Sequence, residues 1–105
     1  MSFLGIDLGT GSVKAAVVDD GVVLAKAGQA YAVDAPRPGW AESDPEAWLD
    51  ATRAVAARTL GDHAPTAVGF SGQMHGVVVT DAALRPLRPA ILWADTRSAD
   101  QARAL

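Results

Sequence analysis

The residue types that could grip a phosphate group lie together near the N-terminus. One acid, two glycines and two hydroxyl side chains fall within six residues, Asp7-Leu8-Gly9-Thr10-Gly11-Ser12. Glycines let backbone N–H groups approach phosphate oxygens, hydroxyls donate hydrogen bonds, and an aspartate can hold magnesium or its water shell. We therefore predict a phosphate-binding loop with a magnesium-binding acid at its start. An ordinary hairpin turn next to an acid explains the same residues equally well.

Three well-known motifs do not match this segment. A P-loop requires glycine at the position of Thr10, and a dinucleotide fingerprint requires glycine or alanine at the position of Lys14. An aspartic protease requires Ser or Thr where Leu8 stands. The ammonium of Lys14 could instead reach a phosphate oxygen as a point charge, or it could be a solvated lysine at a sheet edge.

A second segment has side chains suited to a polyol, Ser71-Gly72-Gln73-Met74-His75-Gly76. It follows a predicted strand, and loops at the carboxyl ends of strands line the ligand crevice in open α/β sheets. Gln73 and His75 can hydrogen-bond hydroxyl groups, while Met74 can pack on the carbon face of a sugar. We predict a sugar-binding loop. The alternative is a loop histidine beside a core methionine.

A third segment places an acid and a base two residues apart, after an apolar run that ends in Trp93. Asp95 and Arg97 are candidates for a binding role at this site. The structural alternative is that Asp95 caps the helix that follows and that Arg97 is a surface base.

Alternating and apolar runs predict that the chain opens with strands over residues 3–7, 13–19 and 22–27. The glycine-rich segment joins the first two strands, and Asp20-Gly21, which suits a type I′ turn, joins the next two. The chain should therefore begin with an antiparallel meander of three strands.

A helix should start at Asp44-Pro45-Glu46 and end at Gly61. Its sheet-facing side should carry Trp48, Thr52, Val55 and Thr59, flanked by Leu49, Ala56 and Leu60. Residues 67–71 should form a covered strand after a crossover, residues 77–80 and 90–93 two short strands, and a last helix should begin at Thr96. This order predicts an α/β fold with a mixed sheet.

The amino-acid composition and charge argue against several classes of partner and site. The chain has 105 residues, of which 50% are hydrophobic, and its net charge of −3 comes from scattered single charges. Nucleic acid and membranes are therefore not expected as partners, and a cytoplasmic location is expected. The absence of cysteine excludes disulfides and thiolate metal sites.

Four segments together resemble, in order and spacing, the N-terminal region of the FGGY family of carbohydrate kinases, and within it the xylulokinases. They are Gly5-Ile6-Asp7-Leu8-Gly9-Thr10, Ala41-Glu42-Ser43-Asp44-Pro45-Glu46-Ala47-Trp48, Ser71-Gly72-Gln73-Met74-His75-Gly76 and Ala90-Ile91-Leu92-Trp93-Ala94-Asp95-Thr96-Arg97. The resemblance implies the ribonuclease H-like, actin/hexokinase-like ATPase fold. Residues 1–105 would be the N-terminal part of the first FGGY domain, a partial domain, and the second domain would be absent from this chain.

The resemblance also implies ATP and Mg²⁺ as cofactors and D-xylulose as the substrate, which the full-length enzyme would convert to D-xylulose 5-phosphate. Asp7 would orient magnesium or phosphate, and the sugar site would contain Gln73, Met74, His75 and Asp95. The ATP phosphates would lie at Gly9, Thr10, Gly11, Ser12 and Lys14.

Because the family's catalytic base lies downstream, this chain alone is expected to be inactive. Ala94 stands where xylulokinases commonly have asparagine, so gluconokinase stays open. A non-catalytic ATP- or sugar-binding module, an inert structural fragment and a homodimer of the full-length enzyme also stay open.

Overall fold

The computed structural model describes all residues from 1 to 105 and divides them into two compact units. The first unit contains residues 1–31 and 47–73, and the second contains residues 32–46 and 74–105.

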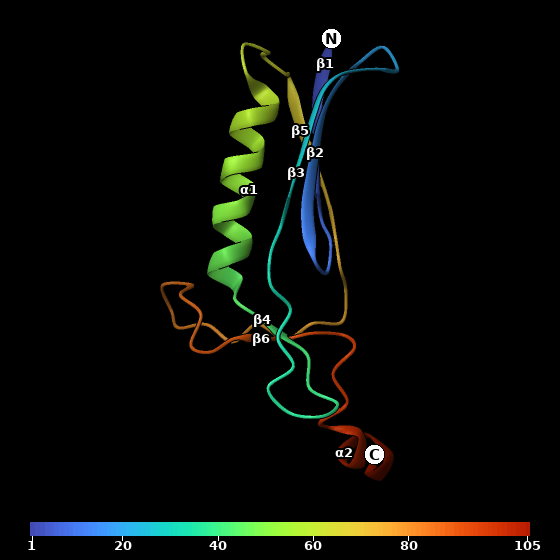
Figure 1. Cartoon of the computed structure of the whole chain (residues 1–105), viewed down its shortest axis with the longest axis vertical. Helices are drawn as coiled ribbons and strands as arrows, with labels where there is room; N and C mark the ends of the chain where they lie inside the picture. Colours follow the sequence, from blue (N-terminus) through green and yellow to red (C-terminus); the bar gives the residue numbers. More distant parts are fainter. The chain divides into compact units, whose positions relative to one another are not determined.

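The first unit is built on a sheet in the order β3-β2-β1-β5 (Figure 1). The strands are β1 (Ser2–Leu8), β2 (Ser12–Asp19), β3 (Val22–Ala30) and β5 (Ala67–Gly72). The first three pair antiparallel in sequence order, whereas β5 pairs parallel to β1. The predicted meander and crossover are therefore confirmed. Asp20 and Gly21, with φ of 48° and 76°, form the turn between β2 and β3, as these two residue types predicted.

The core of this unit lies between the sheet and α1 (Pro45–Leu60). Alternate residues of the first two strands point to the helix, and the buried cluster consists of Leu4, Ile6, Val13, Ala15, Val17, Ala51 and Val55. Asp44 accepts a hydrogen bond from the Glu46 N–H at 2.9 Å, so the helix begins where predicted. The predicted buried face is partly wrong. Ala51 is buried while Leu49 is 44% exposed, because the contact follows the i, i+4, i+8 row of Ala51, Val55 and Thr59.

The prediction that residues 67–71 form a covered strand is wrong with respect to burial. All six residues of β5 are exposed. The reason is that the buried side chains of α1 belong to a cluster with β1 and β2, which leaves β5 at the edge of the sheet beside β1.

The second unit contains a short antiparallel pair, β4 (Glu42–Ser43) with β6 (Ala90–Ile91). Of the two short strands predicted for residues 77–80 and 90–93, the second is confirmed only for Ala90–Ile91, and the first is not formed. Residues 77–80 make only isolated bridges, Val77 with Ile91 and Thr80 with Pro86. Proline lacks an N–H group, so Pro86 and Pro89 interrupt a continuous ladder here.

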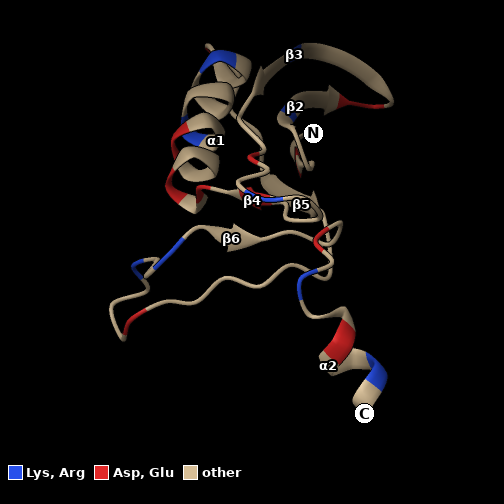
Figure 2. Ribbon diagram, turned by 60° about the horizontal axis from the view of Figure 1, so that its bottom comes forward, with Lys and Arg blue, Asp and Glu red and all other residues tan.

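The last helix, α2 (Ala99–Ala104), starts later than predicted. The Thr96 N–H donates to the carbonyl of Gly39 and the Arg97 N–H donates to the Asp95 carboxylate, which holds both residues outside the helix. Neither helix of the chain combines the length and apolar character needed to cross a bilayer. Acidic and basic residues are interspersed along the ribbon (Figure 2), as the sequence indicated.

Candidate phosphate and sugar site

The glycine-rich segment forms a tight hairpin loop between β1 and β2. The Gly9 N–H donates to the Ser12 carbonyl at 2.8 Å, and the Tyr31 N–H donates to the Gly11 carbonyl at 3.1 Å. A side chain at Gly9 would place its Cβ 3.0 Å from the Ser12 oxygen, so any other residue here would force the loop backbone to shift by a few tenths of an ångström. The predicted phosphate loop is thus a fixed element at the end of two core strands.

The side chain of Tyr31 contacts this loop, and the sequence did not predict this contact. Its hydroxyl lies against the carbonyl oxygens of Gly9 and Ser12, the latter at 3.1 Å. Burial, and secondarily the negative charge of Asp7, raises the pKa of the Tyr31 phenol. The phenol therefore keeps its proton at neutral pH and can donate it to one of the two carbonyls at a time. No motif marks this residue, because it reaches the loop only through the pairing of β2 with β3.

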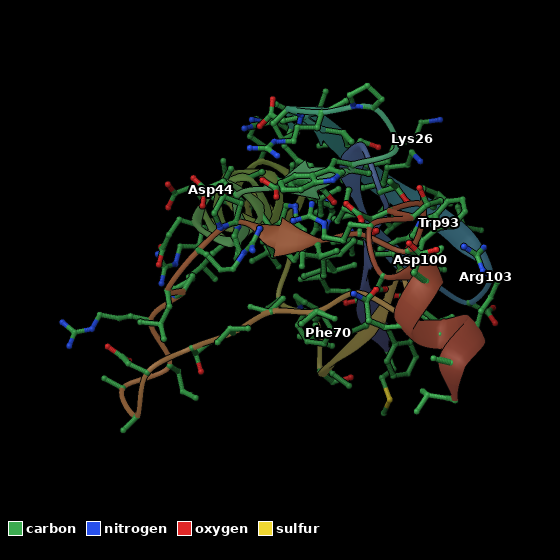
Figure 3. All side chains as sticks on the ribbon, turned by 90° about the horizontal axis from the view of Figure 1, so that it is seen from below. Lys26, Asp44, Phe70, Trp93, Asp100 and Arg103 are labelled. Atoms are coloured by element: carbon green, nitrogen blue, oxygen red, sulfur yellow. The ribbon has the colours of Figure 1, made fainter.

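Asp7 and Lys14 occupy paired positions in the register of β1 and β2, and Ser71 is the partner of Asp7 on β5. The three residues line an open hollow of about 840 Å³ on the sheet. Figure 3 labels two other residues that line it, Lys26 on β3 and Phe70 on β5. An acid, two bases and a hydroxyl thus surround a space next to the loop.

The donor set fits a magnesium ion that is held mainly by a nucleotide. Mg²⁺ is usually bound by one or two carboxylates together with substrate phosphates and water. Asp7 offers one carboxylate, and no cluster of three or more His, Cys, Asp or Glu side chains could hold a metal by itself. The available side chains therefore fit a magnesium ion that is bound together with phosphate groups better than a metal site made of protein ligands alone.

The predicted sugar loop begins beside the phosphate loop. The Gln73 N–H donates to the Leu8 carbonyl at 2.9 Å, immediately before Gly9. The side-chain oxygen Oε1 of Gln73 is buried and has no hydrogen-bond partner. Buried acceptors are nearly always satisfied, so this oxygen is suited to accept a hydrogen bond from a ligand hydroxyl or from water.

Met74 and His75 project to the outside, which contradicts the alternative of a core methionine. Met74 is 71% exposed and His75 is also exposed. His75 has a φ of 61°, a conformation uncommon outside glycine. Backbone strain of this kind concentrates at binding sites, so it supports a functional hypothesis for the loop.

Asp95 and Arg97 form a partly buried ion pair and play neither of the structural roles considered above. The Asp95 side chain is 1% exposed and the Arg97 side chain 16%. Asp95 accepts hydrogen bonds from Arg97 and from the Ala41 N–H, the latter at 2.7 Å. The hydrogen bond from Arg97 is the main reason that the pKa of the Asp95 carboxyl lies well below its usual range. α2 begins further along and has no side-chain cap.

Nearly the whole chain matches one known protein family. The profile described as the N-terminal domain of the FGGY family of carbohydrate kinases matches residues 2–105. The chain belongs to the FGGY family. Xylulose kinase of Escherichia coli (strain K12) is 44% identical, and that of Klebsiella pneumoniae 43% identical, over 98% of this chain. The FGGY chain spans 22% of the length of each of these relatives.

The known structures confirm the fold. The crystal structure of xylulose kinase from Rhodospirillum rubrum superposes with a TM-score of 0.92 at 34% identity, covering 99% of this chain and 23% of that one. The actin/hexokinase-like ATPase fold predicted from the resemblance is therefore confirmed for this FGGY chain. The roles of its individual site residues stay predictions.

Proposed function

We propose that this chain is the N-terminal part of an ATP-dependent xylulose kinase. The reaction transfers the γ-phosphoryl group of ATP to a hydroxyl of D-xylulose and yields ADP and D-xylulose 5-phosphate. The observation that carries the proposal is the 43–44% identity to two xylulose kinases over 98% of the chain. The geometry of the two loops supports it, because each has the chemistry that one of the two substrates requires.

The phosphate side of the site belongs to the first unit. Asp7 orients the magnesium ion, which shields the charge of the ATP phosphates when it is bound. The loop supplies Gly9, Thr10, Gly11 and Ser12, and Lys14 adds a positive charge at the position paired with Asp7. Tyr31 keeps the loop in shape through the carbonyls of Gly9 and Ser12.

The sugar side is the loop after β5. Gln73 offers a buried acceptor, His75 hydrogen-bonds a hydroxyl, and Met74 packs on the carbon face of the sugar. Asp95 belongs to the same side of the site. Residues 1–105 are part of the first FGGY domain. The general base and the adenine site lie elsewhere in the full-length protein. The enzyme works in the cytoplasm. A homodimer stays an open prediction.

The test is an assay of the full-length protein encoded by the gene that contains this chain. ADP release is measured with D-xylulose, gluconate and glycerol at equal concentrations, and the product is identified by ³¹P NMR. We expect the highest kcat/KM for D-xylulose and a 5-phosphate product. A higher kcat/KM for gluconate would replace the proposed substrate within the same family.

A non-catalytic binding module is distinguished by calorimetry on the same sample. Binding of ATP or D-xylulose without turnover, under conditions in which the Escherichia coli relative is active, would refute the kinase and leave the binding module.

A further inference from the structure

Glu42 is the centre of an ion-pair network in the second unit. Its Oε1 atom accepts hydrogen bonds from Arg88 at 2.7 Å and from Arg97 at 2.8 Å. Arg97 also donates to both carboxylate oxygens of Asp95, at 2.9 and 2.6 Å. Glu42 belongs to β4, whereas Asp95 and Arg97 follow β6, so the network joins segments more than 50 residues apart in sequence.

Arg97 is held in one geometry by this network and by an aromatic ring. Its guanidinium carbon lies 3.7 Å from the centre of the Trp40 ring. Planar stacking and a forked set of hydrogen bonds are properties of arginine that lysine cannot reproduce. Buried ion pairs contribute little net stability compared with apolar side chains, and their best-attested use is to fix one arrangement.

The arrangement that is fixed here is the turn that carries Trp93. The Asp95 N–H donates to the Leu92 carbonyl at 3.0 Å, and the Leu92 N–H donates to the Ala41 carbonyl at 2.9 Å. The Asp95 carboxylate also ties the turn to the segment before β4, because it accepts a hydrogen bond from the Ala41 N–H. Trp93 extends from this turn, 58% exposed (Figure 3).

The register of the neighbouring bridge relates this turn to the sugar loop. Val77 and Ile91 exchange two backbone hydrogen bonds, of 2.8 and 3.0 Å. In an antiparallel pair, two residues before Val77 correspond to two residues after Ile91. His75 and Trp93 therefore leave the bridge at the same end.

We propose that Glu42, Arg97 and Asp95 form a positioning clamp, which holds the Trp93 turn in place next to the His75 loop and so shapes the sugar site without touching the sugar. The inference rests on the proposed function in that it takes the ligand of the His75 loop to be a sugar. It gives Asp95 an indirect role, because Arg97 and the Ala41 N–H already occupy its buried oxygens.

The test compares Arg97→Lys with Arg85→Lys in the full-length protein. Both changes keep the charge and disturb an ion pair with an aspartate, but the pair of Arg85 with Asp81 is solvent-exposed. We expect Arg97→Lys to raise the KM for D-xylulose about 10-fold or more, because small misplacements at a site are costly. The KM for ATP should not change, and Arg85→Lys should leave both values unchanged. Glu42→Gln serves as a second variant if Arg97→Lys does not fold.

Amide hydrogen exchange on the same variants provides a readout that does not depend on activity. In Arg97→Lys the amides of Ala41, Leu92 and Asp95 should exchange faster, while those of β1 should not. Faster exchange with an unchanged sugar KM, or an equal rise of the sugar and ATP KM, would overturn the positioning role.

The fate of the proposed function is read separately from the wild type. If the wild type prefers another sugar, only the substrate changes and the KM comparison is made with that sugar. If it phosphorylates none, the proposed function fails, and unchanged exchange in Arg97→Lys would overturn the clamp as well.

Discussion

At the scale of single residues, variants of His75 test whether the loop after β5 binds a sugar or is an ordinary loop. Its side chain is exposed and its φ is positive, so the folded chain gains little from the imidazole itself. We expect His75→Ala in the full-length enzyme to lower kcat/KM for D-xylulose by about 5- to 150-fold, which corresponds to roughly 1–3 kcal/mol for one unpaired hydroxyl. The melting temperature should change little.

Two further variants isolate the side chain of His75. His75→Gly removes the imidazole and relieves the positive φ, so it should show the same kinetic loss with no loss of stability. His63→Ala, at the other histidine of the chain, should leave the kinetics unchanged. A lower melting temperature with unchanged kcat/KM in His75→Ala would contradict the sugar contact.

Asp7 is the residue whose charge should matter for turnover and not for sugar affinity. We expect Asp7→Asn to lower kcat by roughly 10²-fold or more, because the carboxylate acts on magnesium and phosphate charge in the transition state. The matched control is Asp20→Asn, in a turn at a φ of 48° that asparagine tolerates. A comparable loss of sugar affinity in Asp7→Asn would place this acid in the sugar site.

At the scale of elements, the contact of α1 with the sheet supports the strand that ends in Asp7. Val55 is fully buried in the cluster formed with β1 and β2. Val55→Ala should lower the free energy of unfolding by about 2 kcal/mol, from lost burial and a residual cavity. Val22→Ala, at an exposed position of β3, should cost much less. Equal losses in a denaturant titration would show that α1 does not anchor the sheet.

The stability that the Asp95–Arg97 ion pair gives to the fold should decrease at acid pH. Arg97 lowers the pKa of Asp95 below its ordinary value of 3.8, so the unfolded state binds the proton first as the pH falls. The ion pair therefore stabilises the fold above about pH 4 and this contribution is lost progressively below it.

Melting curves of the full-length protein between about pH 6 and 3 check this dependence. Asp95→Asn should show a shallower loss of melting temperature with falling pH than the wild type. Asp62→Asn, at an exposed position, should not change the slope of melting temperature against pH. The same slope in Asp95→Asn and wild type would show that this pair contributes nothing to acid sensitivity.

At the scale of the whole molecule, the chain contains the predicted phosphate loop and the predicted sugar loop but spans only 22% of the length of its xylulose kinase relatives. We expect the purified 105-residue chain to phosphorylate no sugar, because a missing general base alone is worth roughly 10²- to 10⁴-fold. The measurement is ADP release with D-xylulose, with the full-length protein as the positive control. Turnover by the short chain above the rate without protein would contradict this prediction.

The sequence alone determined the elements and positions that depend on local chemistry. The Asp20-Gly21 turn, the start of α1 at Asp44 and its end near Gly61, and the parallel crossover to β5 follow from backbone preferences and hydrophobic periodicity. Both candidate loops could be found for the same reason, because their glycines and polar side chains lie next to one another in the sequence.

Only the tertiary structure decided the features that join distant segments. Tyr31 reaches the phosphate loop through the pairing of β2 with β3, and Glu42 meets Arg97 through the pairing of β4 with β6. The exposure of β5 likewise depends on where α1 packs. Such contacts are set by packing and by strand register across long separations, and no local pattern of residue types encodes them.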